Sequence, residues 1–142
     1  MSNEKMRFGE HEVWFDSETG FGHLTFIGVL DEPELVQINE VFAGWQKKAG
    51  PGEPTFVMVD NRRSDGISRD GRKAMASMSR PDADVYCAIH GASFAVRVVL
   101  NLVFKATALT SKNATIVRYE SSESEAREWL NSHQQAYLAR KR

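Results

Sequence analysis

The chain has 142 residues, of which 42% are hydrophobic and 26% charged, a composition typical of one globular domain with its own core. Its formal net charge of -1 provides no excess of positive charge to attract phosphates, so we expect no nucleic-acid binding. We therefore treat residues 1–142 as a single domain.

The first predicted elements are two strands that form a hairpin. Glu12–Asp16 reads as the first strand, and His23–Leu30 reads as the second, after a glycine-containing turn. A helix should follow with Asp31 as its N-cap, because Glu34 and the apolar residues behind it have helical spacing. The run of glycine and proline at Gly50–Pro54 should end this helix.

The middle of the chain repeats strand and helix. Thr55–Val59 is a continuous apolar run, typical of a strand covered on both faces, and Val85–Ile89 reads as another. A polar loop after Val59 should lead to a helix capped by Ser68, and Ser93 should cap a long helix that ends near Leu109.

The last predicted elements are the strand Ala114–Tyr119 and a helix that begins with Ser122 and Glu125 as a capping-box pair. The whole order is strand, strand, helix, strand, helix, strand, helix, strand, helix. Such alternation predicts an α/β fold: a single five-stranded mixed, mostly parallel sheet with an N-terminal hairpin and four helices.

Three segments carry a resemblance to a known family: VDNRR after the third predicted strand, ISRDGRKA at the next helix start, and SSESEAREWL near the end. With the element order, they resemble the SpoIIAA-like branch of the STAS domains (sulfate transporter and anti-sigma factor antagonist). This branch is also compared with the lipid-carrying CRAL-TRIO domains. The resemblance implies a regulatory module that binds a protein partner and performs no catalysis.

The resemblance also implies a difference in regulation. Anti-sigma factor antagonists begin this helix with Asp-Ser-Ser-Gly and are switched by phosphorylation of the second serine. Here the corresponding residues are Ser68, Arg69, Asp70 and Gly71, so a carboxylate occupies the phosphoacceptor position. A kinase cannot add or remove that charge, so we expect no phospho-switch of this kind. Modification of Ser64 or Ser68 stays open, although an N-cap serine is commonly structural.

The predicted recognition surface is the segment from Asp60 to Gly71 with the neighbouring loop His90–Ser93. It lies where parallel strands are expected to end, the edge at which open α/β sheets meet their ligands. Basic side chains dominate it and could face an acidic partner or an anion, or could be a solvated cluster paired with nearby aspartates. The candidate binding residues are Asp60, Arg62, Arg63, Ser68, Arg69, Asp70, Arg72 and His90.

The predicted helix Ser93–Leu109 is apolar around most of its circumference, because its polar residues recur only every fourth position. Such a helix needs cover on two sides, and the sheet supplies one. A neighbouring helix, a second copy of the chain in a homodimer, or a lipid-like ligand could supply the other. The last choice gives the alternative function, a small carrier of a lipid-like or anionic amphipathic ligand with arginines near the pocket mouth.

No motif in the sequence specifies catalysis, a cofactor or a metal. Cys87 and His90 are three residues apart in a strand and should point to opposite faces, so they do not form a nucleophile–base pair. The segment Met1–Phe15 lacks the apolar core of a secretory signal, and Phe94–Leu109 is shorter than the roughly 20 residues that span a bilayer. We therefore expect a cytoplasmic protein without a membrane span.

Overall fold

The computed structural model describes residues 4–77, 83–108 and 115–141. The described strands form one six-stranded sheet in the order β1-β2-β3-β4-β5-β6. They are β1 (Met6–Phe8), β2 (His11–Asp16), β3 (Phe21–Leu30), β4 (Thr55–Ile67), β5 (Val85–His90) and β6 (Thr115–Glu120). The helices are α1 (Glu32–Ala49), α2 (Arg69–Ser77), α3 (Phe94–Ala108) and α4 (Glu123–Lys141).

The sheet combines an antiparallel start with a parallel remainder. β1 pairs with β2 and β2 with β3 in antiparallel fashion, whereas the pairs from β3 to β6 are all parallel. The predicted mixed sheet with an N-terminal hairpin and four helices is confirmed, but the predicted count of five strands is wrong. The additional strand, β1, has only three residues, too few for a period-2 pattern to identify it.

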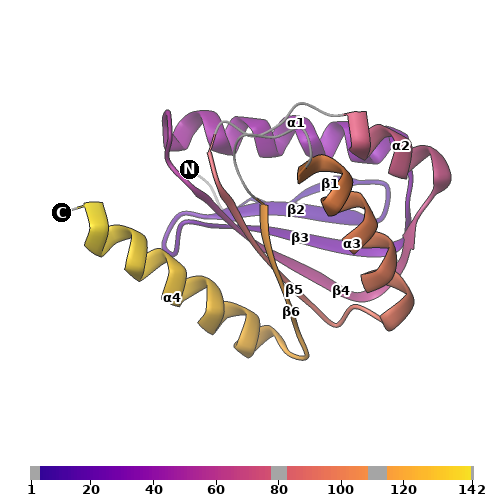
Figure 1. The fold of residues 1–142 in the computed structure, drawn as a ribbon. Coiled ribbons are helices and arrows are strands. Elements are labelled where there is room, and N and C mark those ends of the chain that lie inside the picture. The colour runs from indigo at the N-terminus through magenta and orange to yellow at the C-terminus, as the bar shows by residue number, and fades with distance from the viewer. Residues whose placement is uncertain (1–3, 78–82, 109–114, 142) are drawn as a thin grey trace.

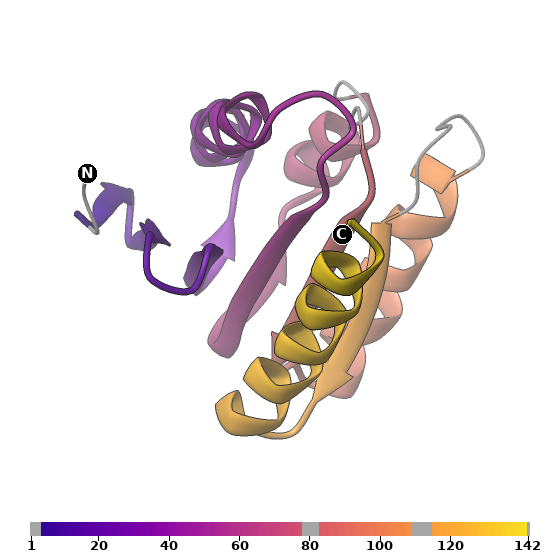
Figure 2. The same cartoon turned by 90° about the vertical axis from the view of Figure 1, so that its left-hand side faces the viewer.

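Two layers of helix enclose the sheet. Figures 1 and 2 show α1, α2 and α3 on one face, which we call the inner face, and α4 on the opposite, outer face. This arrangement follows from the strand order, because parallel crossovers that advance in one direction with the same hand place their helices on the same side. The two faces of β4 show the result: Val57 and Val59 are buried in the core cluster that includes α3 residues, and Phe56 and Met58 pack against α4.

Local side-chain chemistry sets the starts of the helices. The Asp31 carboxylate accepts a hydrogen bond from the Glu32 amide at the start of α1. The hydroxyl groups of Ser68, Ser93 and Ser122 accept from backbone amides in the first turns of α2, α3 and α4. The four predicted helix starts are confirmed, because each depends on contacts within a few residues. The predicted end at Leu109 and the predicted strand start at Ala114 lie outside the described residues.

The main departure from the prediction is the length of β4. The strand does not end at Val59 but continues to Ile67, and its second half pairs with β3 as far as Leu30. The pairing contains a β-bulge: Thr25 faces Asp60 and Ile27 faces Arg63, so two β4 residues lie opposite one residue of β3. The polar run that reads as a loop is therefore strand, held by a partner distant in sequence.

Candidate functional site

The first part of the predicted recognition surface lies where β5 ends beside β4. Asp60 is the register partner of His90, the last residue of β5. The Asp60 carboxylate accepts hydrogen bonds from the Arg62 amide at 3.0 Å, from Nε at 3.0 Å and from Nη2 at 2.7 Å. Burial favours a higher pKa for Asp60, but these hydrogen bonds outweigh burial and lower its pKa below the ordinary value. Asp60 is thus an ionised anchor that orients the Arg62 guanidinium.

His90 is buried at the end of β5. Its ring is buried, with 2% of the residue exposed, and Nδ1 has no hydrogen-bond partner among the described residues. Burial lowers the pKa of His90, and the Asp60 charge opposes that effect only in part, so the ring is neutral at pH 7. Cys87 packs with the inner-face cluster, as predicted from its spacing, and burial raises the pKa of its thiol to about 12.

Gly91 brings the loop after β5 directly against Arg62. A Cβ atom on Gly91 would lie 3.1 Å from both the backbone N and the Cα of Arg62 and would overlap its Cγ atom. Gly91 also has a φ of +77°, in the left-handed region that favours glycine. The predicted neighbourhood of the Asp60 segment and the His90–Ser93 loop is therefore present in the fold.

The second part of the surface is the start of α2. The Ser68 hydroxyl donates to the Asp31 carboxylate at 2.5 Å and accepts from the Gly71 amide at 3.0 Å. The hydrogen bond from Ser68 is the largest cause of a lowered Asp31 pKa, followed by the bond from the Glu32 amide. The N-termini of α1 and α2 are thus joined through two capping side chains.

The predicted residues divide into two groups because β4 is long. Asp60, Arg62 and His90 lie at one end of the β4 extension, and the α2 start with Ser68 lies at the other. At about 3.3 Å per residue, the seven steps from Asp60 to Ile67 extend over roughly 20 Å. The candidate surface therefore consists of two clusters of residues, one at each end of the β4 extension. We call this whole surface the recognition rim.

The charged residues of this rim are exposed, and some have partners. Arg63, Arg69, Asp70 and Arg72 are exposed, as is Arg62, whose side chain is 64% exposed while it pairs with Asp60. The Arg72 guanidinium donates to the Ile67 carbonyl at 2.8 Å. The rim thus exposes four arginines, two on the β4 extension and two in the first turn of α2.

A cavity that the sequence analysis did not locate lies on the inner face. It has a volume of about 220 Å³ and lies between the sheet and helices α1, α2 and α3. Its wall includes Val96, Leu100 and Phe104 of α3, which agrees with the predicted apolar pocket wall. Among the described residues that line it, none carries a charged side chain.

The outer side of α3 exposes a second apolar feature. Phe94, Val98 and Leu102 follow one another at four-residue spacing and are 81%, 44% and 64% exposed. This stripe is the part of the helix that the predicted second cover would occupy. Neither the described sheet nor the described helices bury it.

Two further observations concern the chemistry available to the described part of the chain. Residues 4–77, 83–108 and 115–141 contain no group of three or more His, Cys, Asp or Glu side chains arranged for a metal ion. Within the same ranges, no helix combines the length and the hydropathy required to cross a bilayer.

Comparison with solved structures identifies the fold. The unphosphorylated form of the anti-sigma factor antagonist SpoIIAA superposes with a TM-score of 0.51 and 12% identity, over 84% of this chain and 96% of that one. An uncharacterised DUF3478-family protein from Shewanella loihica PV-4, described as having a SpoIIAA-like fold, superposes with a TM-score of 0.46 and 13% identity, over 89% of this chain and 90% of that one. No protein-family model and no curated protein matches the chain. The chain has a SpoIIAA-like STAS fold, as the sequence resemblance predicts.

Proposed function

We infer that this SpoIIAA-like domain is a non-catalytic regulatory module that recognises a protein partner through the rim formed by β4 residues 60–67, the α2 start and the His90–Ser93 loop. The observation that carries the proposal is the set of four exposed arginines on this rim, on a protein whose net charge is only -1. Charge gathered on one rim favours an oriented encounter with an acidic protein surface.

The two ends of the rim are held by contacts that would pre-organise it for binding. Asp60 fixes the Arg62 guanidinium through two hydrogen bonds and accepts a third from the Arg62 backbone amide, and Gly91 packs against the Arg62 backbone. At the other end, the hydrogen bond between Ser68 and Asp31 ties the α2 start to α1. A rim ordered before binding loses less conformational entropy when a partner docks.

The same contacts support recognition without a phospho-switch at the helix start. The Ser68 hydroxyl already donates to one group and accepts from another, which suits a structural cap. Asp70 is exposed in the first turn of α2 and would present a permanent carboxylate at the position where the resemblance implies a phosphoserine. The recognition surface would then be constitutive.

The chemistry of the buried groups supports a binding role over catalysis. The Cys87 thiol, with a pKa of about 12, is protonated at neutral pH and is a poor nucleophile. The Asp60 carboxylate is engaged by Arg62, and a carboxylate held in this way is a weak base. Neither His90 nor Asp60 lines the inner-face cavity.

A charge-reversal pair tests the rim. The tagged wild-type domain, the double variant Arg63→Glu/Arg69→Glu and the control Lys47→Glu/Lys48→Glu would be used to capture proteins from the source organism. The control changes the charge equally at exposed residues in the last turn of α1, far from Asp31. A partner retained by the wild type and the control but lost by the rim variant supports the proposal.

The affinity of that partner is then measured with purified proteins. Binding should weaken at least tenfold in Arg63→Glu/Arg69→Glu and should fall with added salt, because both changes act on the same charges. Asp70→Ser should also change the affinity, since it removes the fixed carboxylate. Equal affinities for the wild type and the rim variant would contradict the proposal, and an unchanged affinity for Asp70→Ser would remove Asp70 from the recognition surface.

A further inference from the structure

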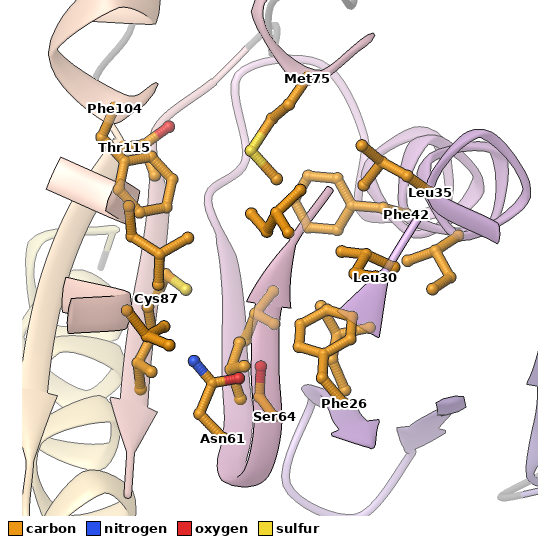
Figure 3. A pocket seen from close by; sticks show the side chains of 18 of the residues that line it. Phe26, Leu30, Leu35, Phe42, Asn61, Ser64, Met75, Cys87, Phe104 and Thr115 are labelled. Carbon is orange, nitrogen blue, oxygen red and sulfur yellow. The ribbon is translucent and has the colours of Figure 1, made fainter. Parts of the chain in front are cut away.

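The inner-face cavity is larger than packing defects in ordinary protein cores. Its volume of about 220 Å³ exceeds that of a cavity of about 150 Å³ that stays dry and holds benzene. Figure 3 shows it between α1, with Leu35 and Phe42, and the Phe104 and Thr115 side, with Met75 of α2 at one end. The space is partly open to solvent, and its apolar lining is surface from which a ligand of this size would displace water.

The cavity has a structural cause in the spacing of the helices. α1 packs over Val13 and Leu30, and α3 packs over β5, while the nine-residue α2 contributes Met75 to the described part of the cavity wall. The middle of β3 between them is incompletely covered: Leu24 and Phe26 are only partly buried although they face the helices. The sheet is therefore wide enough that the described helices leave part of its apolar surface uncovered.

Asn61 supplies an unpaired hydrogen-bonding group at the edge of this apolar space. The residue is 5% exposed, and its side-chain oxygen has no hydrogen-bond partner among the described residues. Asn61 lines the cavity together with Ser64, and Figure 3 shows both at the end opposite Met75. Buried polar atoms are nearly always paired, so an unpaired oxygen facing a cavity indicates a missing donor.

The β-bulge explains how two polar residues reach this position. Along a regular strand, residues 61 and 64 would face opposite sides of the sheet, because successive side chains alternate. The extra β4 residue between the pairs Thr25–Asp60 and Ile27–Arg63 reverses that alternation and lets both side chains line the cavity. Bulges commonly redirect side chains next to functional sites.

We propose that the inner-face cavity binds a neutral, medium-length aliphatic molecule whose terminal hydroxyl donates a hydrogen bond to Asn61. This site adjoins the recognition rim, because the β4 segment of the rim also contributes Asn61 and Ser64 to the cavity wall. Scaling from benzene in about 150 Å³ gives about nine non-hydrogen atoms for the cavity volume. The ligand is neutral because none of the described lining side chains is charged, and a buried carboxylate without a counter-charge is strongly disfavoured.

The wall chemistry also assigns a role to Ser64. Its hydroxyl oxygen accepts a hydrogen bond from the Gly66 amide at 3.1 Å, so its proton points elsewhere and can be donated. A ligand hydroxyl can donate to Asn61 and accept from Ser64 at the same time. An ether of the same size can only accept, and it would leave the Asn61 oxygen unpaired.

Three small probes of similar size test this chemistry on the purified full chain by isothermal titration: octan-1-ol, 1-methoxyheptane and octanoate. We expect saturable binding of octan-1-ol, about fivefold to tenfold weaker binding of 1-methoxyheptane, and still weaker binding of octanoate at pH 7. No saturable binding of octan-1-ol up to its solubility limit, or tighter binding of octanoate, would overturn the proposal.

Paired variants locate the binding. Leu100→Trp places a large ring in the cavity, whereas Leu102→Trp makes the same change on the exposed side of α3. Octan-1-ol binding should be lost in Leu100→Trp and kept in Leu102→Trp, with circular dichroism to verify that both fold. If Leu100→Trp does not fold, Asn61→Leu tests the assignment instead. This variant should bind octan-1-ol and 1-methoxyheptane equally well. A preference that survives Asn61→Leu, or binding that survives in a folded Leu100→Trp, contradicts the assignment.

Discussion

The contact between Gly91 and Arg62 allows a prediction about stability. Alanine substitutions at Gly91 and at a second glycine separate the cost of the left-handed backbone from the cost of overpacking. Gly91→Ala should lower the free energy of unfolding because of its left-handed φ of +77° and because the new methyl group meets Arg62. The Arg62 Cγ atom can move aside, but the backbone N and Cα at 3.1 Å can yield only if β4 or the loop shifts. We assign about 1–2 kcal/mol to the backbone conformation and about 1–3 kcal/mol to the overpacking.

Gly28→Ala is the matched control for Gly91→Ala. Gly28 has a nearly identical φ of +74°, and no atom lies within 4 Å of the Cβ position that alanine would add. This variant should therefore lose only about 1–2 kcal/mol, from the backbone conformation alone. Urea unfolding at 25 °C, followed by circular dichroism, gives both values. Equal losses for the two variants would refute the conclusion that the loop packs tightly against Arg62.

Three further predictions follow from the caps, the buried histidines and the outer side of α3. Ser68→Ala should lower the free energy of unfolding by about 1–2 kcal/mol in urea titrations. The loss should exceed that of the capping variant Ser93→Ala, because Ser68→Ala also removes the hydrogen bond to Asp31. Equal losses for the two variants would contradict a role for that bond. Burial lowers the pKa values of His11, His23 and His90 from 6.5, so the unfolded chain binds protons first as the pH falls. Stability should be complete above about pH 6.5 and should decline from there down through the lowered folded-state values, and a urea midpoint unchanged between pH 7.5 and 5.5 would refute this. If α3 mediates self-association, Leu102→Glu should lower the mass measured by light scattering at high concentration, and a wild-type chain that is monomeric throughout would exclude that interface.

The parts of the fold that depend on local contacts could be predicted from the sequence. Asp31, Ser68 and Ser93 each satisfy amides within three residues, so their identity and position already indicate a helix start. The apolar run Thr55–Val59 likewise indicates a strand covered on both faces. These features, taken in order, were sufficient for the fold class.

The extension of β4 could not be predicted in the same way. Arg62–Asp65 is polar and has the composition of a loop, and it becomes strand only because β3 is long enough to pair with it. The consequence for the candidate site is large, since the predicted continuous edge divides into two groups joined by strand. The role of Asn61 has the same origin, because the bulge that directs it to the cavity is a property of pairing between strands.

The prediction for α3 was right about the helix and incomplete about its surroundings. Helical spacing indicates that its apolar residues face several directions, and the structure places Leu100 at the cavity and Leu102 at the exposed surface. The sequence contains no measure of how far α1 lies from α3. The cavity is a consequence of that separation, and only the three-dimensional arrangement contains it.

Hydrogen–deuterium exchange of the domain, alone and saturated with the protein partner recovered by the charge-reversal experiment, tests the recognition rim most directly. The account predicts slower exchange on binding in peptides that cover residues 62–71 and the His90–Ser93 loop, with little change in the last turns of α1 and α4. Protection confined to α4 or to the exposed side of α3, with the rim unchanged, would contradict it.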